Sequence, residues 1–331
     1  MATIKDVASD AGVAVGTVSK VLNGHYVSPE NKRKVEESIE RLGYQMNYYA
    51  RGLKTSYTYT VAVIIPDILN PFFARLVCAA EQELYKSGYR MFLCQSQSDP
   101  EKDSYYLRLA RQNKVDGIMG ITFNETELSL AGDIPVVMID RHLQHKVCCV
   151  SSDNFHGGEL AAKRLIDGGC QKLLFIRSGS HLSSETLKRG EGFASMCREK
   201  KTAYEMLDSG DDTGAIDDGT IRNYLKERII DGKASFDGIY TSTDNLALIV
   251  LDLLSHLHIR VPEDVQLIGH DGLRQMNRGP YLVSSIAQPI EEMARAAVNN
   301  LLKLIRKEPA REMTMLPVEF VEGGTTRKNY G

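Results

Sequence analysis

Apolar residues near the N-terminus recur every three or four positions, which predicts three short helices with one shared core. The first covers residues 4–11 and the second covers residues 15–22, with a glycine-containing turn between them. The third runs from Ser28-Pro29, where the serine can cap the helix and the proline suits its first position, to Gly43. Two short helices joined by such a turn, with a third beside them, form a helix-turn-helix arrangement.

From about residue 60 the pattern changes to short apolar runs that alternate with longer helical segments. The runs predict strands at Val61–Pro66, Arg90–Cys94, Gly117–Ile121, Val136–Ile139, Leu173–Ile176, Gly238–Thr241 and Gln266–Ile268. Helices are predicted between most of them, among them Phe72–Ser87, Asp103–Asn113, Gly158–Gly168 and Asn245–Leu257. This alternation is typical of parallel sheets with helices on both faces. The remaining length exceeds one such sheet, so we expect two α/β lobes.

Composition places the chain among ordinary globular proteins. Its 331 residues leave room for two to three domains of ~150 residues each, and 43% of them are hydrophobic. No stretch approaches the ~18 uncharged apolar residues of a membrane helix, and the N-terminus lacks a signal-peptide core. The six cysteines include no C-x-x-C pair, and the adjacent Cys148 and Cys149 would point to opposite faces of a strand. We therefore expect reduced cysteines in a cytoplasmic protein without membrane contact.

The net charge of −3 is unevenly distributed. Residues 1–60 carry eight Lys/Arg against six Asp/Glu, whereas the remainder carries 32 against 37. Within the basic head, the outer face of the second predicted helix is polar and consists of Thr17, Ser19, Lys20 and Asn23. Hydroxyls, an amide and a lysine suit phosphate oxygens and base edges in the major groove of DNA. This face favours DNA binding over the more ordinary interpretation, a plain helical hairpin.

Two segments of the head carry a more specific signal. The run Ala11-Gly12-Val13-Ala14-Val15-Gly16-Thr17-Val18-Ser19-Lys20-Val21-Leu22-Asn23 and the opening Thr3-Ile4-Lys5-Asp6-Val7-Ala8 strongly resemble the lactose-repressor (LacI-type) family of bacterial transcription regulators. Shorter motifs extend the resemblance over essentially the whole chain; they are Leu42-Gly43-Tyr44, Ala50-Arg51-Gly52-Leu53, Asp116-Gly117-Ile118, Ser152-Asp153-Asn154, Arg189-Gly190-Glu191-Gly192-Phe193, Val261-Pro262-Glu263-Asp264-Val265 and Gln288-Pro289-Ile290.

The resemblance implies the domain organisation. An all-α helix-turn-helix head at residues 1–57 is followed by an α/β body at residues 60–331, similar to periplasmic sugar-binding proteins. Such a body has two doubly wound parallel-sheet lobes joined by three crossings. We place the first lobe at about 60–160 and 288–316, and the second at about 161–287 and 317–331.

By the same resemblance the second helix is the recognition helix, with Val15, Gly16 and Lys20 at base-reading positions. Gly16 offers no side chain to a base, so readout there must come from neighbours or from DNA shape. Residues 47–54 match a hinge helix that folds on DNA and inserts Leu53 into the minor groove; alone, so short a helix is marginal in water, and a flexible linker is the alternative. The predicted DNA-binding residues are Thr3, Val15, Gly16, Thr17, Ser19, Lys20, Asn23, Asn47, Ala50, Leu53 and Lys54.

Ligands of doubly wound sheets bind beyond the carboxyl ends of the strands, where this chain places polar and aromatic residues. The resemblance assigns effector contacts to Asp153, Arg189, Asp271 and Gln288, and the strand ends add Phe72, Phe73, Arg141 and Thr243. The fork of an arginine and the acceptor pair of an aspartate suit vicinal hydroxyls. Each strand-end aspartate alone could instead cap the following helix. His270-Asp271-Gly272 departs from the family's usual Phe-Asp-Asp, and together with Val150–Gly158 it resembles sucrose-operon repressors.

We therefore expect a homodimeric repressor of a carbohydrate operon, which binds a pseudo-palindromic operator and responds to a small sugar between its lobes. A sugar can act only as far as it binds the two lobe states differently. A regulator with a co-repressor, such as a nucleobase or a phosphoprotein partner, is an alternative. So is a protein of another class, a sugar carrier or a sugar-processing enzyme. The chain has no G-x-x-x-x-G-K-[ST], G-x-G-x-x-G, G-x-S-x-G or H-E-x-x-H motif, so we predict no enzyme activity, catalytic residue, metal or cofactor.

Overall fold

The computed structural model describes residues 2–22, 25–44, 57–122, 125–141, 147–178, 185–209, 218–275 and 279–327. The chain divides into two compact units, residues 1–58 and 59–331, which we call the head and the body. None of the helices among the described residues is both long and apolar enough to span a membrane.

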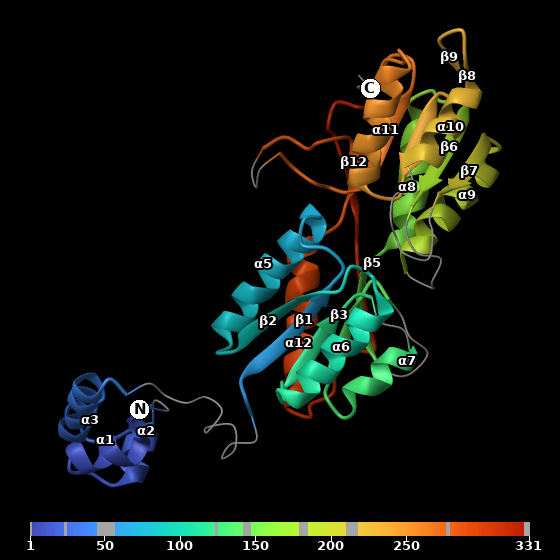
Figure 1. Cartoon of the computed structure of the whole chain (residues 1–331). Coiled ribbons are helices and arrows are strands. Elements are labelled where there is room, and N and C mark those ends of the chain that lie inside the picture. Colours follow the sequence, from blue (N-terminus) through green and yellow to red (C-terminus); the bar gives the residue numbers. More distant parts are fainter. Residues whose placement is uncertain are drawn as a thin grey trace. The chain divides into compact units, whose positions relative to one another are not determined.

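The head contains the three predicted helices, α1 (Ile4–Asp10), α2 (Val15–Leu22) and α3 (Pro29–Leu42), as Figure 1 shows. A capping box begins α1. The Thr3 hydroxyl accepts a hydrogen bond from the Asp6 backbone amide, and the Asp6 carboxylate accepts one from the Thr3 backbone amide. One fully buried valine from each helix (Val7, Val18 and Val35) forms the centre of the core. The predicted helix-turn-helix arrangement is confirmed.

The first lobe of the body is a parallel six-stranded sheet in the order β13-β5-β4-β3-β1-β2. Its strands are β1 (Thr60–Ile65), β2 (Arg90–Gln95), β3 (Gly117–Gly120), β4 (Val136–Ile139), β5 (Cys148–Ser152) and β13 (Met313–Leu316). Helices α5 (Pro71–Lys86) and α12 (Ile290–Ile305) cover one face, and α6 (Pro100–Gln112) with the short α7 (Glu125–Leu128) covers the other (Figure 1). Burial of both faces explains the continuous apolar run of β1.

The second lobe is a six-stranded sheet in the order β14-β12-β11-β10-β6-β7, in which β14 alone of these strands runs antiparallel to its neighbour. Its strands are β6 (Lys172–Arg177), β7 (Ala203–Asp208), β10 (Gly238–Thr241), β11 (Gln266–Asp271), β12 (Ser285–Ala287) and β14 (Glu319–Val321). Helices α8 (Asn154–Asp167) and α9 (Lys188–Lys200) cover one face, and α10 (Asp218–Arg228) and α11 (Asp244–His256) cover the other.

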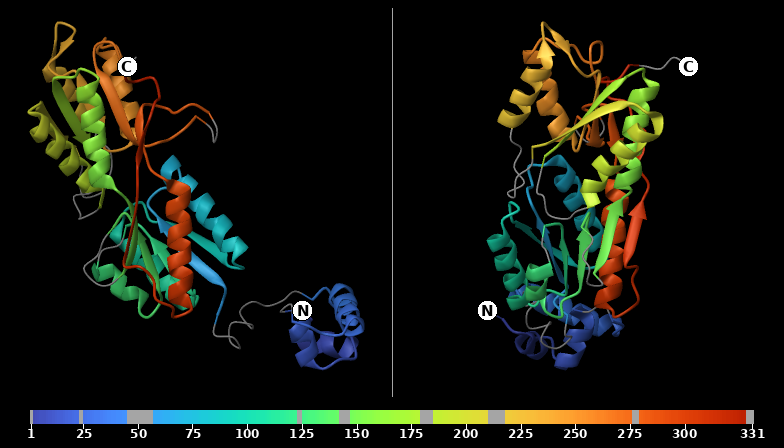
Figure 2. Two further views of the ribbon diagram at one scale, coloured as in Figure 1. Left: turned by 180° about the vertical axis from the view of Figure 1, so that it is seen from behind. Right: turned by 90° about the vertical axis from the view of Figure 1, so that its right-hand side faces the viewer.

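Three crossings join the lobes, at Asp153, at residues 288–289 and at residues 317–318 (Figure 2). The first crossing differs from the expected boundary near residue 160. The reason is that α8 belongs entirely to the second lobe, where its buried face, with Ala161 and Leu165, contacts α9 and the second sheet.

Helices α8 and α9 approach each other closely enough for backbone contact. A Cβ atom on Gly158 would lie 2.0 Å from the Arg189 carbonyl oxygen, and one on Gly192 would lie 1.9 Å from the Phe155 carbonyl oxygen. The two glycines therefore set the helix spacing that places the Arg189 side chain.

Replacing Gly192 by alanine should force these helices apart. We expect the free energy of unfolding to fall by about 1–3 kcal/mol, the usual cost of overpacking, with a lower melting temperature of the body in calorimetry. Gly16→Ala is the control, because the added Cβ would meet no atom within 4 Å. An unchanged melting temperature for Gly192→Ala would contradict the close contact.

Candidate DNA-binding surface and effector site

Of the polar side predicted for helix α2, Lys20 is exposed to solvent. Gly16 and Lys20 are exposed, as is Val15 (39% exposed), whereas Thr17 and Ser19 are half-buried and Val18 packs in the core. The exposed side thus combines an apolar group, a position without a side chain and a cation. This is a surface that can approach both bases and phosphates in the major groove.

Two further features of the head bear on this surface. The Thr3 hydroxyl is engaged in the cap of α1, where it donates to the Asp6 carboxylate at 2.8 Å. Tyr26, which follows α2, is 90% exposed and was not among the predicted residues, although an aromatic in a polar loop is a signal that could have singled it out. The predicted contacts Asn23, Asn47, Ala50, Leu53 and Lys54 lie outside the described residues.

At the junction of the two lobes, the body brings together three predicted effector residues from distant elements. Arg189 of α9 is 2% exposed, and its Nη1 atom lies 3.7 Å from Oδ1 of Asp271, the last residue of β11. The same Oδ1 accepts a hydrogen bond of 2.8 Å from Nε2 of Gln288, which lies in the second crossing. The result is a buried cation, carboxylate and amide in one connected group.

Asn154 of α8 and two residues of the first lobe, Asp140 and Ser152, join this group in addition to the predicted effector contacts. Asn154 accepts a hydrogen bond of 2.6 Å from Nε of Arg189 and donates to the Asp140 carboxylate at 3.3 Å. Ser152 donates to Oε1 of Gln288 at 2.7 Å. We call these residues the junction network: Asp140, Ser152, Asn154, Arg189, Asp271 and Gln288. The sequence signal that could have indicated Ser152 and Asn154 is the polar Ser-Ser-Asp-Asn segment directly after an apolar run.

The remaining predicted effector residues lie outside the junction network. Phe72 is buried in the first turn of α5, with the half-buried Phe73 ring edge-on to it at 5.3 Å between centroids. Arg141 follows β4, is 7% exposed and donates to the Thr122 carbonyl oxygen, and burial lowers the pKa of its guanidinium. Asp153 and Thr243 cap α8 and α11. For Asp153 this is the capping role that the sequence left open, and for Thr243 the capping role is new.

Burial dominates the electrostatics of Asp271. Desolvation raises the pKa of this carboxyl to about 6, although Arg189 and the Gln288 amide favour its charged form. A carboxyl whose pKa is higher in the folded than in the unfolded state stabilises the fold below the unfolded value, and that contribution is lost as the pH rises through the folded value. The contribution of Asp271 to the stability of the fold is therefore lost between pH values of about 4 and 6.

The variant Asp271→Asn, which resembles the neutral acid, should therefore unfold less readily than the wild type at pH 7.5, and by a smaller margin at pH 4.5. The physical reason is that the amide carries no buried charge at either pH. Urea unfolding between pH 4.5 and pH 7.5 measures the difference in the free energy of unfolding between the two proteins. Titrating groups that both proteins share cancel in this difference. Parallel profiles would show that Asp271 does not change its protonation between the folded and unfolded states.

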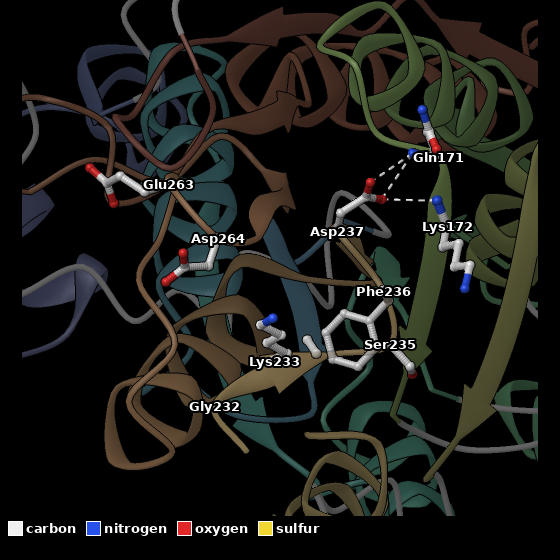
Figure 3. Close-up of a pocket in the computed structure, with 10 residues that line it drawn as sticks. Gln171, Lys172, Gly232, Lys233, Ser235, Phe236, Asp237, Glu263 and Asp264 are labelled. Carbon is white, nitrogen blue, oxygen red and sulfur yellow. Dashed lines mark hydrogen bonds between the residues drawn. The ribbon is translucent and has the colours of Figure 1, made fainter. Parts of the chain in front are cut away.

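A surface depression of about 520 Å³ lies at the opposite end of the second lobe (Figure 3). It lies near the amino ends of β6 and β10, beside Lys172, Lys233 and Asp237. The Asp237 carboxylate accepts hydrogen bonds from the backbone amides of Gln171 and Lys172, so its role here is to hold the local backbone in place. Since ligands of parallel sheets bind at the carboxyl ends, the junction network is the stronger candidate site.

Comparison with known families and proteins gives matches over both units. Residues 3–47 match the bacterial regulatory proteins of the lacI family, and residues 162–326 match the periplasmic binding protein-like domain. The chain is 34% identical over 329 residues to the sucrose operon repressor of Streptococcus mutans, covering 98% of this chain and 99% of that protein. It is also 34% identical over 331 residues to the ribose operon repressor of Bacillus subtilis, covering 99% of both.

Among solved structures, the lac repressor dimer bound to operator and the anti-inducer ONPF is similar over 98% of this chain and 99% of that one. The TM-score is 0.83 at 21% sequence identity. At that identity the likeness concerns the fold, and it supports a head of three helices followed by two α/β lobes.

Proposed function

Because the chain belongs to the lacI family of bacterial regulatory proteins, we propose that it represses an operon for the use of a carbohydrate. As a member of this family, it is a DNA-binding transcriptional regulator. In our proposal the head binds a pseudo-palindromic operator, the body dimerises with a second copy, and a small sugar at the lobe junction controls operator affinity. The protein then acts in the cytoplasm by binding alone, without catalysis.

The observation that carries this proposal is the junction network. Its Arg189, Asp271 and Gln288 side chains supply a donor fork, an acceptor pair and an amide, with Asp271 paired with Arg189 at 3.7 Å and hydrogen-bonded to Gln288. This combination suits the neighbouring hydroxyls of a sugar, which both donate and accept. The network also extends through Asn154 to Asp140 of the first lobe. A ligand bound there contacts both lobes and can favour one lobe arrangement over another.

In the head, we propose that α2 enters the major groove, with Thr17, Ser19 and Lys20 on phosphates and base edges. The hinge at residues 47–54 would fold on the operator and place Leu53 in the minor groove. A helix of two turns gains its stability from such docking, because alone it is marginal in water. Effector-dependent lobe movement would then change how well the two hinges of the dimer fit the operator.

A thermal-shift screen followed by operator binding tests the function. Sucrose and ribose are the first ligands, because the two relatives repress operons for these sugars, and guanine and hypoxanthine represent the co-repressor alternative. We expect one sugar to raise the melting temperature and to release operator DNA in mobility-shift assays. A stabilising nucleobase that strengthens operator binding, with no response to any sugar, would overturn the proposal.

A further inference from the structure

The turn that presents Asp271 has a constrained backbone. Asp271 has a φ of 123°, and Gly272 follows with a φ of 73°. A Cβ atom on Gly272 would lie 2.5 Å from that of Ala287, so this position requires glycine. Non-glycine residues with positive φ persist where the surrounding contacts hold them, often at ligand sites. We call Asp271–Gly272–Leu273 the effector turn.

The second lobe holds the effector turn firmly in place. The Leu273 amide donates to Oδ2 of Asp244 at 2.7 Å, and the Gly272 amide donates to Oγ of Ser285 at 3.1 Å. The Ser285 hydroxyl in turn donates to Oδ1 of Asp244 at 2.6 Å. Both Asp244 and Ser285 are fully buried. The turn therefore moves as one piece with the second sheet.

The first lobe also contacts this turn through a side chain, that of Arg75. Arg75 extends from α5, and its Nη1 donates to the Gly272 carbonyl oxygen at 3.4 Å. Its Nη2 lies 2.7 Å from Oε1 of Glu291, in the first turn of α12. Glu291 follows the second crossing by two residues, so Arg75 is anchored within the first lobe beside the point where the chain enters it.

Resting on the function proposed above, we propose that Arg75 is a positioning residue of the effector response, one that ties the effector turn to the first lobe. A hydrogen bond weakens steeply with distance and angle, so this contact forms over a narrow range of lobe arrangements. It favours those in which Asp271 lies close to the first lobe. A sugar that contacts both lobes favours the same lobe arrangements. In a protein without Arg75, part of the free energy of sugar binding is therefore spent on bringing the lobes into these arrangements, and the sugar binds more weakly.

The first test is sugar affinity of the full-length protein, measured by calorimetry with sucrose and ribose. We expect Arg75→Met to weaken binding about three- to tenfold, the range for loss of one hydrogen bond, and Arg75→Lys to recover part of the loss. Lys86→Met is the matched control, because this cation at the other end of α5 pairs with Glu83 in its own lobe. Unchanged or tighter binding by Arg75→Met would overturn the proposal.

The second test does not depend on a sugar. Spin labels at Tyr85→Cys and Ile230→Cys, both exposed and in different lobes, would report inter-lobe distances in a Cys78→Ser background. We expect Arg75→Met to shift the distances to longer values in protein without sugar, and Lys86→Met to leave them unchanged. Identical distances in wild type and Arg75→Met would refute the role of Arg75. If the distances shift but the wild type binds neither sugar, the proposed function fails while the inter-lobe contact stands.

Discussion

Replacing Thr17 and Lys20 together by alanine is expected to weaken operator binding at least tenfold and to leave sugar affinity unchanged. Lys20 is exposed on α2, and the loss of one charge-assisted contact costs about 1.5–3 kcal/mol, or ten- to hundredfold in affinity. The core of the head lies within a compact unit of its own, so the substitution should not reach the junction network.

Mobility-shift titrations at several salt concentrations measure this effect, on an operator recovered by selection from random DNA. If Lys20 contacts a phosphate, the slope of log affinity against log salt should fall by about 0.9 in the variant. Lys32→Ala is the control, because Lys32 lies on the outer side of α3 near Glu36. Operator affinity equal to that of the wild type would remove α2 from the interface.

The second large effect is expected at Arg189. Arg189→Ala should weaken sugar binding about ten- to hundredfold, because a buried charge-assisted contact is lost, and should leave operator DNA bound when sugar is added. It should also lower the melting temperature, since Asp271 then remains buried without its cation. Arg189→Lys keeps the charge without the planar fork, so it should fold like the wild type and still bind the sugar more weakly.

Calorimetry with the sugar found by screening, together with thermal unfolding, separates binding from stability. Arg260→Lys is the control, since it makes the same substitution in an arginine that pairs with an aspartate, Asp264, away from the junction. If Arg189→Lys and Arg189→Ala both bind the sugar as the wild type does, and Arg189→Ala alone melts at a lower temperature, Arg189 has a structural role and the effector site lies elsewhere.

Short sequence patterns were sufficient to predict the elements whose structure depends on residues close together in the chain. The helices of the head are defined by capping residues, a C-terminal glycine and apolar spacing within a few positions, and all three were predicted. The seven predicted strands of the body are also present. Six of them are buried on both faces and therefore have a continuous apolar sequence, and the more exposed edge strand β2 has apolar residues as well. The strand β5 escaped the prediction because it ends in serines. The sheet-edge strand β7 escaped because it is largely exposed and carries charged residues.

The candidate site depended on contacts between residues far apart in the chain. Motifs resembling a known family pointed to Arg189, Asp271 and Gln288, but no local pattern predicts that Ser152 contacts Gln288, 136 positions away, or that Arg75 contacts Gly272, 197 positions away. By itself, the sequence determined the three helices of the head, the strands with continuous apolar runs and the residue types available for a sugar. Only the tertiary structure decided which side chains meet, because the crossings bring segments from both lobes to one junction, where most buried polar groups form hydrogen bonds with one another.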